Sequence, residues 1–315
     1  MKTGMANNTQ PAVESDGRGF WYFIALDALL AVFTVTGNAI VILLIYSRRC
    51  LRINTNYFIV SLATADLLVG LSLPTFSIAC SLWFPCVETA FYKFFNLFTC
   101  VSIANLVFMT IDRFLAICWP FWYFSKVTAK RIGVAIATAW LVPCVLTMVP
   151  FMWMYSSDDA VKTSLNNVYY LVMLVLIELM PAVVMPMMYT RIFLTVRRHN
   201  RLVRQQRRQL SFNCQFKSSV TDTTSTQASG RRSREVEKSS TIALGLVILL
   251  FVLCWAYDIY VSLCTRVQGV CEVKSNRVES VSNLLIYLNS CVNPFVYFLI
   301  KRDVKRELKA CLKCK

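Results

Sequence analysis

Seven long apolar runs, separated by short polar connections, dominate the pattern of residues along this chain. They lie near 20–46, 57–82, 88–118, 132–154, 168–196, 240–264 and 279–300. Each has the roughly 20 residues that a helix needs to cross the roughly 30 Å hydrocarbon layer of a bilayer. Because lipid cannot hydrogen-bond an open backbone, we expect all seven to be helices. The pattern predicts an all-α membrane protein with a seven-helix bundle over residues 20–300.

The composition points to a membrane independently of this pattern. Of 315 residues, 57% are hydrophobic and 16% are charged, and the mean hydropathy is +0.54. A soluble domain carries about a quarter charged residues, because its surface must face water. The excess of apolar side chains therefore requires lipid.

Basic residues gather on alternate connections. They occupy the first and third connections, the long connection 197–238 and the tail 301–315, and they are few elsewhere. This asymmetry places the basic side in the cytoplasm and the N-terminus outside the cell, as expected of a multi-pass plasma-membrane protein. The net charge of +16 then reports topology and attraction to anionic lipid, and does not indicate a nucleic-acid partner.

The segments outside the apolar runs have distinct expected roles. Residues 1–19 form a short extracellular tail without a cleaved signal, in which Asn7 begins a glycan acceptor triplet. In the connection 197–238, we expect 201–208 to extend the fifth helix and the Ser- and Thr-rich stretch 218–229 to stay unfolded. Phosphorylation and a solvated tether are both compatible with that stretch.

The tail is predicted to form a short amphipathic eighth helix, over 301–313, along the inner leaflet. Cys311 and Cys314 have a spacing that elsewhere suggests zinc or redox chemistry. Just below a membrane, lipid acylation fits these two cysteines better.

Three motifs stand out in the apolar runs. Asp112-Arg113-Phe114 lies near the end of the third run, residues 56–68 read NYFIVSLATADLL, and residues 289–297 read NSCVNPFVY. Together they resemble motifs of the rhodopsin-like (class A) G-protein-coupled receptors. The resemblance covers nearly the whole chain and is closest in places to the adenosine and biogenic-amine branch. It implies a receptor that binds an extracellular ligand and activates a heterotrimeric G protein, with arrestin, receptor kinases and membrane lipid as further partners.

The resemblance also implies a sodium-binding polar network around Asp66 in the second run. A carboxylate at membrane depth is costly unless it is paired or hydrogen-bonded. The network comprises Asn38, Asp66, Ser102, Asn289, Ser290 and Asn293. A protonated Asp66 that is only hydrogen-bonded in the core remains the alternative. No cofactor is expected besides this allosteric sodium ion.

A conformational switch is implied at the inner ends of the third, fifth, sixth and seventh helices. In the family, the arginine is held by its neighbouring aspartate and by a glutamate on the sixth helix, and such charge pairs are bistable. The switch positions carried over are Asp112, Arg113, Tyr189, Glu237, Pro294 and Tyr297. Three further switch positions, Ile103, Pro181 and Phe251, match the family's core connector.

Two departures from the family pattern stand out. The sixth helix has Tyr257 where the family has a kink-forming proline. High basal activity and impaired signalling are both open consequences. The second outer loop, 155–167, holds no cysteine, so the usual disulfide from the third helix is absent. As in adenosine receptors, Cys264 and Cys271 could instead close a ring in the third outer loop, on the oxidising side of the membrane.

The ligand is only partly constrained by the resemblance. Amine receptors hold the ammonium with an aspartate where this chain has Phe95, and adenosine receptors hold adenine with an asparagine where it has Ser262. Acidic and polar residues nevertheless gather in the outer half, which suits a small polar ligand that is cationic or nucleoside-like. The expected pocket residues are Asp27, Phe95, Asn96, Thr99, Glu178, Trp255, Asp258, Asn283 and Tyr287.

Other functional classes fit less well. A channel or transporter calls for paired repeats or a charged conduction path, whereas the chain has an odd number of runs. An enzyme needs a nucleophile with a base or a metal constellation. His199 is the sole histidine and lies on the cytoplasmic side, so we expect no enzyme.

Overall fold

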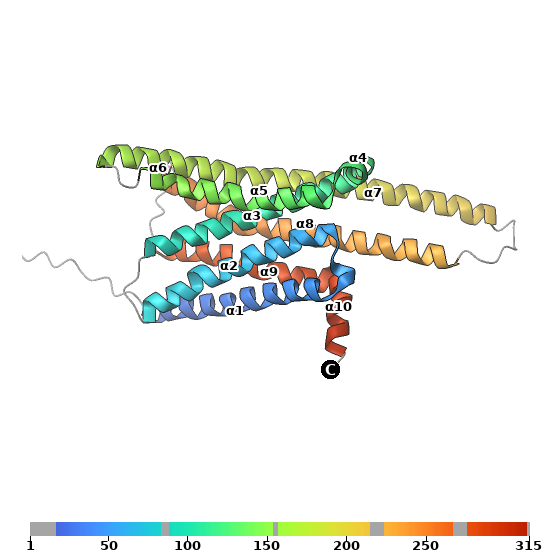
Figure 1. The fold of residues 1–315 in the computed structure, drawn as a ribbon, viewed down its shortest axis with the longest axis horizontal. Helices are drawn as coiled ribbons and strands as arrows, with labels where there is room; N and C mark the ends of the chain where they lie inside the picture. The colour runs from blue at the N-terminus through green and yellow to red at the C-terminus, as the bar shows by residue number, and fades with distance from the viewer. Residues whose placement is uncertain (1–16, 83–87, 154–156, 215–223, 267–275, 314–315) are drawn as a thin grey trace, which may run out of the picture.

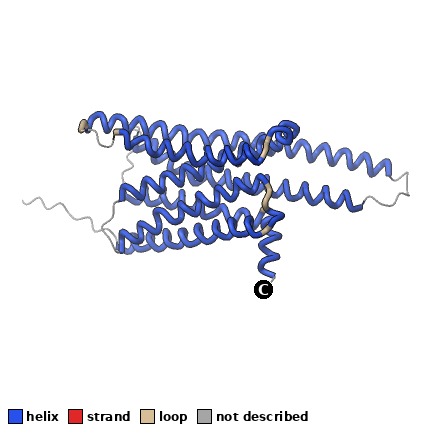
Figure 2. Tube along the Cα trace, viewed as in Figure 1, coloured by secondary structure: helices blue, strands red, loops and turns tan. Residues whose placement is uncertain are grey.

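The computed structural model describes residues 17–82, 88–153, 157–214, 224–266 and 276–313, some of them by backbone alone, and within these ranges it contains helices and no strand. Seven helical segments are long and apolar enough to cross a membrane. They lie side by side along the long axis of the molecule, as Figure 1 and Figure 2 show. The predicted all-α bundle of seven spans is therefore confirmed.

The spans follow the predicted order. They are α1 (Gly17–Ser47), α2 (Asn54–Leu82), α3 (Glu88–Cys118), α5 (Ala129–Met148), the continuous rod of α6 (Asp159–Met173), a π-helical turn (Leu174–Leu179) and α7 (Met180–Cys214), then α8 (Thr224–Arg266) and α9 (Asn276–Ile300). Short 3-10 turns follow α1 (Arg49–Leu51) and α5 (Val149–Met152). The small helix α4 (Pro120–Lys126) connects α3 to α5, and α10 (Arg302–Lys313) follows α9.

The fifth span starts further out than the sequence predicted. We expected a loop to about residue 167, but α6 begins at Asp159. Asp158 caps it, since its Oδ1 accepts from the backbone amides of Ala160 at 2.9 Å and Val161 at 3.2 Å. An acidic cap satisfies amides that have no partner in a first turn and complements the helix dipole.

The fifth and sixth spans also extend further into the cytoplasm than expected. Helix α7 continues to Cys214 and α8 begins at Thr224, so residues 224–229 are helical where we predicted an unfolded stretch. The physical reason is cooperativity, because each residue added to an existing helix gains a hydrogen bond without a new nucleation cost. Residues 218–223 lie outside the described ranges.

Small residues let α1 pack closely on its neighbours. A Cβ on Gly37 would lie 3.1 Å from the Pro294 side chain of α9, and one on Gly70 of α2 would lie 3.0 Å from the Thr34 side chain of α1. These approaches bring α1, α2 and α9 together on one side of the bundle, with α3 packed between α2, α5 and α7.

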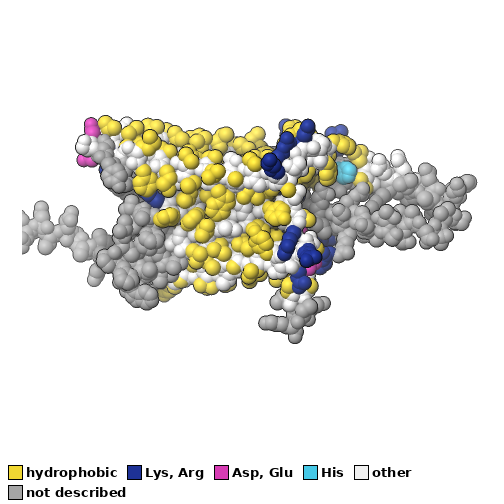
Figure 3. Space-filling model, viewed as in Figure 1, with side chains coloured by type: hydrophobic (Ala, Val, Ile, Leu, Met, Phe, Trp, Pro, Cys, Tyr) yellow, Lys and Arg dark blue, Asp and Glu magenta, His cyan; other side chains and the backbone are white. Residues whose placement is uncertain are grey.

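The outer surface of the bundle is apolar, as a lipid-facing surface must be. Leu43, Val145, Met187, Leu253 and Leu299 are exposed large side chains on five different spans. In Figure 3, hydrophobic side chains cover the middle of the visible face, and lysine and arginine gather towards the end that carries α4 and α10. This end is the predicted cytoplasmic one.

Candidate functional site: a buried carboxylate and an inner arginine

Asp66 lies in α2 with its side chain completely buried. The Ser102 hydroxyl of α3 donates to its Oδ1 at 2.7 Å, and Asn293 Nδ2 of α9 donates to its Oδ2 at 2.8 Å. Ser290 also hydrogen-bonds to this carboxylate. We call these four residues the Asp66 cluster. Three helices thus converge on one acid, through partners that the sequence had suggested.

The donor chemistry around Asp66 fits a hard cation. Carboxylate, hydroxyl and amide oxygens are the ligands that such ions prefer. Asn289 directly precedes Ser290 in α9; its Oδ1 is buried, and no described residue donates to it. An unpaired buried oxygen is costly unless an ion or water binds it.

Asn38 joins this region to the backbone of α9. Its Nδ2 donates to the Thr34 carbonyl at 2.9 Å and to the Ser290 carbonyl at 3.3 Å. Its predicted place beside the polar network is therefore matched by its contacts, which hold α1 on the α9 segment that carries Ser290.

A second polar layer, which sequence reasoning missed, lies nearer the cytoplasm. Trp140 Nε1 of α5 donates to Ser61 Oγ of α2 at 3.0 Å, and that hydroxyl donates to Asn105 Oδ1 of α3 at 2.6 Å. These bonds fix three helices relative to one another. A Ser and an Asn on two apolar spans were the signal, since buried polar groups need partners.

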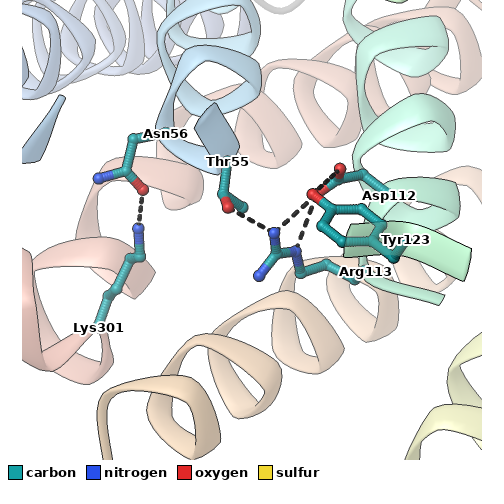
Figure 4. Close-up of polar contacts among 6 residues, drawn as sticks. All are labelled: Thr55, Asn56, Asp112, Arg113, Tyr123 and Lys301. Atoms are coloured by element: carbon teal, nitrogen blue, oxygen red, sulfur yellow. Dashed lines mark hydrogen bonds and ion pairs between the residues drawn. The ribbon is translucent and has the colours of Figure 1, made fainter. Parts of the chain in front are cut away.

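The inner arginine is held by a compact set of bonds (Figure 4). Arg113 Nη2 lies 2.7 Å from Asp112 Oδ2 and donates to Thr55 Oγ1 of α2 at 2.6 Å. The Tyr123 hydroxyl of α4 donates to Asp112 Oδ1 at 2.8 Å. We call these four residues the arginine cluster. Burial and the nearby Asp112 raise the pKa of Tyr123 to about 12, so its hydroxyl keeps the proton that it donates.

A buried lysine adjoins the arginine cluster. Lys301 lies at the junction of α9 and α10. Its Nζ donates a hydrogen bond to Asn56 Oδ1 and lies 3.3 Å from Asp303 Oδ2. Burial lowers the pKa of Lys301 to about 8, and Asp303 partly opposes that shift. Lys301 and Arg113 line one small inner cavity together with Tyr297.

The predicted second partner of Arg113 is not described. Glu237 belongs to α8, but its side chain lies outside the described part of the structure. The three core-connector residues, Ile103, Pro181 and Phe251, are all buried. The Phe251 ring lies 5.7 Å from the Trp255 ring, centroid to centroid.

The two switch tyrosines differ in their surroundings. Tyr297, which follows Pro294 in α9, is buried, and its hydroxyl has no hydrogen-bond partner among the described residues. Tyr189 of α7 packs against the bare backbone of Gly245 in α8, where an added Cβ would lie 2.0 Å from the tyrosine ring and hydroxyl. Gly245 is therefore what lets the inner ends of α7 and α8 approach.

The expected ligand residues are partly brought together in the outer half. The Phe95 and Tyr287 rings lie 5.3 Å apart, and Ser282 donates a hydrogen bond to Asp258. Thr99 Oγ1 and Trp255 Nε1 are buried polar atoms without a hydrogen-bond partner among the described residues.

The remaining expected pocket residues lie on four helical segments. Glu178 belongs to the π-helical turn, and Asn96 is exposed on α3. Asp27 on α1 and Asn283 on α9 form no hydrogen bond with this group in the described part of the chain.

The modification sites are only partly described. Cys264 forms a disulfide, and its predicted partner Cys271 lies outside the described residues. Asn7 and Cys314 also lie outside them. Cys311 is exposed on α10, with its Sγ 3.0 Å from Arg48 Nη2.

Comparison with known proteins agrees with this geometry. The seven-transmembrane receptor (rhodopsin) family matches residues 37–297. An octopamine receptor beta-2R of Chilo suppressalis is 28% identical over 91% of this chain and 78% of its own. The human adenosine receptor A2b is 30% identical over 90% of this chain and 87% of its own, and a rat histamine H2 receptor is 27% identical over 91% and 78%.

A seven-helix bundle with a buried carboxylate and an inner Asp-Arg pair defines the class as a membrane receptor. The chain belongs to the rhodopsin family of seven-transmembrane receptors, and it is a receptor and not an enzyme.

Proposed function

We propose that this receptor binds a small polar ligand in the outer half of its bundle and activates a heterotrimeric G protein in the cytoplasm. The observation that supports this most strongly is the arginine cluster. The Arg113 guanidinium is bonded to Asp112 of its own helix and to Thr55 of α2, and a helix movement can break the contact with α2.

The mechanism is a shift between two populations. Ligand binding favours a new arrangement around Trp255 and Phe251, weakens the Asp66 cluster and releases Arg113 from Asp112 and Glu237. The inner ends of the helices then separate and expose a groove for the G protein. Because the two sites are linked, the G protein tightens agonist binding by the same factor.

The ligand is a small polar molecule, cationic or nucleoside-like. Three similar proteins are named as octopamine, adenosine and histamine receptors. In this chain, Phe95 packs on Tyr287 where amine receptors place an acid, so Asp258 and Glu178 are the acids offered to a cationic group.

A sodium ion bound at Asp66 stabilises the resting state. The carboxylate and the side chains of Ser102 and Asn289 supply oxygen donors of the right chemistry. Release of the ion on activation makes sodium a negative regulator of agonist binding.

The protein acts at the plasma membrane with its N-terminus outside. Asn7 carries a glycan there, while Cys311 and Cys314 carry acyl chains that hold α10 on the inner leaflet. Receptor kinases and arrestin act on the cytoplasmic side after activation.

A direct test is ligand-dependent nucleotide exchange. Purified receptor is reconstituted with a panel of G proteins and screened against amines and nucleosides. Exchange that rises with ligand supports the proposal. Exchange that stays at the receptor-free rate with every ligand, while sodium crosses protein-containing liposomes, would support a channel instead.

A constitutively active or signalling-impaired receptor is the second candidate. Tyr257 replaces the proline of the sixth span, and α8 runs unbroken from Thr224 to Arg266. A constitutively active receptor gives agonist-free nucleotide exchange well above the rate without receptor. A signalling-impaired receptor gives no exchange with any ligand that it binds.

A further inference from the structure

A cavity of about 210 Å³ lies among the outer ends of α3, α5 and α6. Lys93 of α3 and Lys162 of α6 line it, together with the amides of Asn96 and Asn166. Among the described residues that line it, none is an aspartate or a glutamate. We call it the lysine cavity. Except for Asn96, it is built from residues outside the predicted ligand site.

The walls of the lysine cavity are fixed by specific contacts. Trp153 Nε1 donates to Asn166 Oδ1 at 2.8 Å, and the Trp153 ring meets the Tyr169 ring edge-on at 6.1 Å. The Lys93 ammonium lies 3.7 Å from the centre of the Phe151 ring. Because Trp153 occupies the acceptor oxygen of Asn166, this amide offers its NH2 donor to a further partner.

The outward extension of α6 brings Lys162 to this place. Asp158 starts the helix and Lys162 follows one turn later, on the wall that faces α3. Both lysine side chains are half-buried. Two half-buried ammonium groups favour an anion more strongly than two lysines in open water, since the local dielectric is lower.

The lining thus offers two cations and amide donors. Tyrosine hydroxyls add donors that also accept. The complement of this set is a group with several acceptor oxygens and a negative charge. We infer that the lysine cavity binds an oxyanion group, a carboxylate, sulfate or phosphate, either as a free ion or as the acid of a larger extracellular ligand. This site is separate from the acids Asp258 and Glu178, and binding to it does not require G-protein coupling.

The test measures binding on purified receptor in detergent, by the shift of its thermal unfolding with ligand concentration. In the first arm, sodium sulfate at low millimolar concentration is compared with sodium chloride at equal sodium concentration, with potassium chloride added to match the ionic strength. In the second arm, histidine is compared with histamine, and adenosine monophosphate with adenosine. Histidine has a carboxylate that histamine lacks, and adenosine monophosphate has a phosphate that adenosine lacks.

The variants are Lys93→Gln and Lys162→Gln, singly and together. Lys126→Gln, an exposed lysine of α4, is the matched control. We expect each cavity substitution to weaken anion binding about tenfold, which is the loss of one charge-assisted bond. The control should bind as the unchanged receptor does. The double variant Lys93→Arg and Lys162→Arg keeps both charges and should retain anion binding. It tests the role of charge even if the Gln variants fold poorly.

The outcomes distinguish the sources of the oxyanion. A lysine-dependent shift with sulfate identifies a free-ion site. A lysine-dependent shift with only the acid-bearing members identifies a subsite for a ligand's acid. The inference is wrong if sulfate and the acid-bearing ligands shift the unfolding temperature of the unchanged receptor no more than they shift that of the Gln variants. If the unchanged receptor binds the anion but activates no G protein, the proposed coupling is wrong and the inference about the lysine cavity still holds.

Discussion

At the inner end of the bundle, the polar groups of the arginine cluster satisfy one another. Arg113, Asp112, Thr55 and Tyr123 form hydrogen bonds of 2.6 to 3.1 Å that connect α2, α3 and α4. Each charged group has a protein partner. The arrangement is therefore specified by the chain alone.

The outer half, by contrast, shows separate polar contacts between single pairs of side chains. Asp258 accepts from Ser282, and Trp153 donates to Asn166, while the buried Thr99 hydroxyl has no hydrogen-bond partner among the described residues. Polar groups left over by the protein are groups available to a ligand. The difference suggests that the inner half sets the resting state and the outer half receives the signal. Changes in each half should therefore have separable effects.

The largest effect is expected from Asp66→Ala. This change leaves the donors of Ser102 and Asn293 buried and unpaired, at about 1–3 kcal/mol each. Thermal stability and ligand-dependent nucleotide exchange should both fall, and stabilisation by sodium chloride over choline chloride should disappear. Asp27→Ala, on the outer part of α1, should keep the sodium response. If both variants lost the sodium response equally, the inner and outer halves would not have separate roles.

Lys301 makes stability depend on pH. Its pKa is about 8 in the folded protein against 10.5 ordinarily, because burial disfavours the ammonium. Between these values the unfolded chain binds more protons, so stability should rise with pH across this window, by roughly 3 kcal/mol in total. Asp303 and Arg113 are the charged groups that act on Lys301. In thermal unfolding from pH 7.5 to 10.5, Lys301→Met should flatten the rise; an unchanged slope would assign it to another group.

Gly245→Ala should separate α7 from α8. The new methyl would overlap the Tyr189 ring and hydroxyl, at an overpacking cost of about 1–3 kcal/mol. Forcing the inner ends apart should raise agonist-independent exchange several-fold. Gly133→Ala is the matched control, because nothing lies within 4 Å of its Cβ position. If both variants signal like the unchanged receptor, the contact does not restrain the resting state.

Tyr123→Phe should have the smallest effect of the four. It removes one hydrogen bond to Asp112, worth about 1 kcal/mol at a half-buried site. Agonist-independent exchange should rise only a few-fold, and ligand affinity in the absence of G protein should stay unchanged. Tyr57→Phe, at an exposed position on α2, controls for loss of a hydroxyl. A larger effect of Tyr57→Phe would argue against a role for the Tyr123 bond.

Much of the fold and part of the site could be predicted from the chain. Long apolar runs located the spans because lipid imposes a length, and the costly acid Asp66 demanded buried partners. The motifs at Arg113 and Asn293 were short, local and close to the family pattern. These features are properties of single segments or of one demanding side chain.

The rest depended on contacts between distant segments or on weak local signals. Thr55 and Lys301 reach the inner site only because α2, α3 and the end of α9 meet there, which no spacing within one helix reveals. The short helix that carries Tyr123 had a local signal, Pro120 at its first position. The early start of α6 had one too, the acidic pair at Asp158 and Asp159, but the segment lacked the apolar character of a span.

The length of α8 has a mechanical consequence. From Phe251 in the core to its first residue, Thr224, the helix measures about 40 Å at 1.5 Å per residue. If this rod moves as one piece, a tilt of about 5° at the core carries its cytoplasmic tip through roughly 3.5 Å. The helix thereby acts as a lever arm: an ångström-scale adjustment around a small molecule becomes a larger displacement at the cytoplasmic tip, where a protein partner binds.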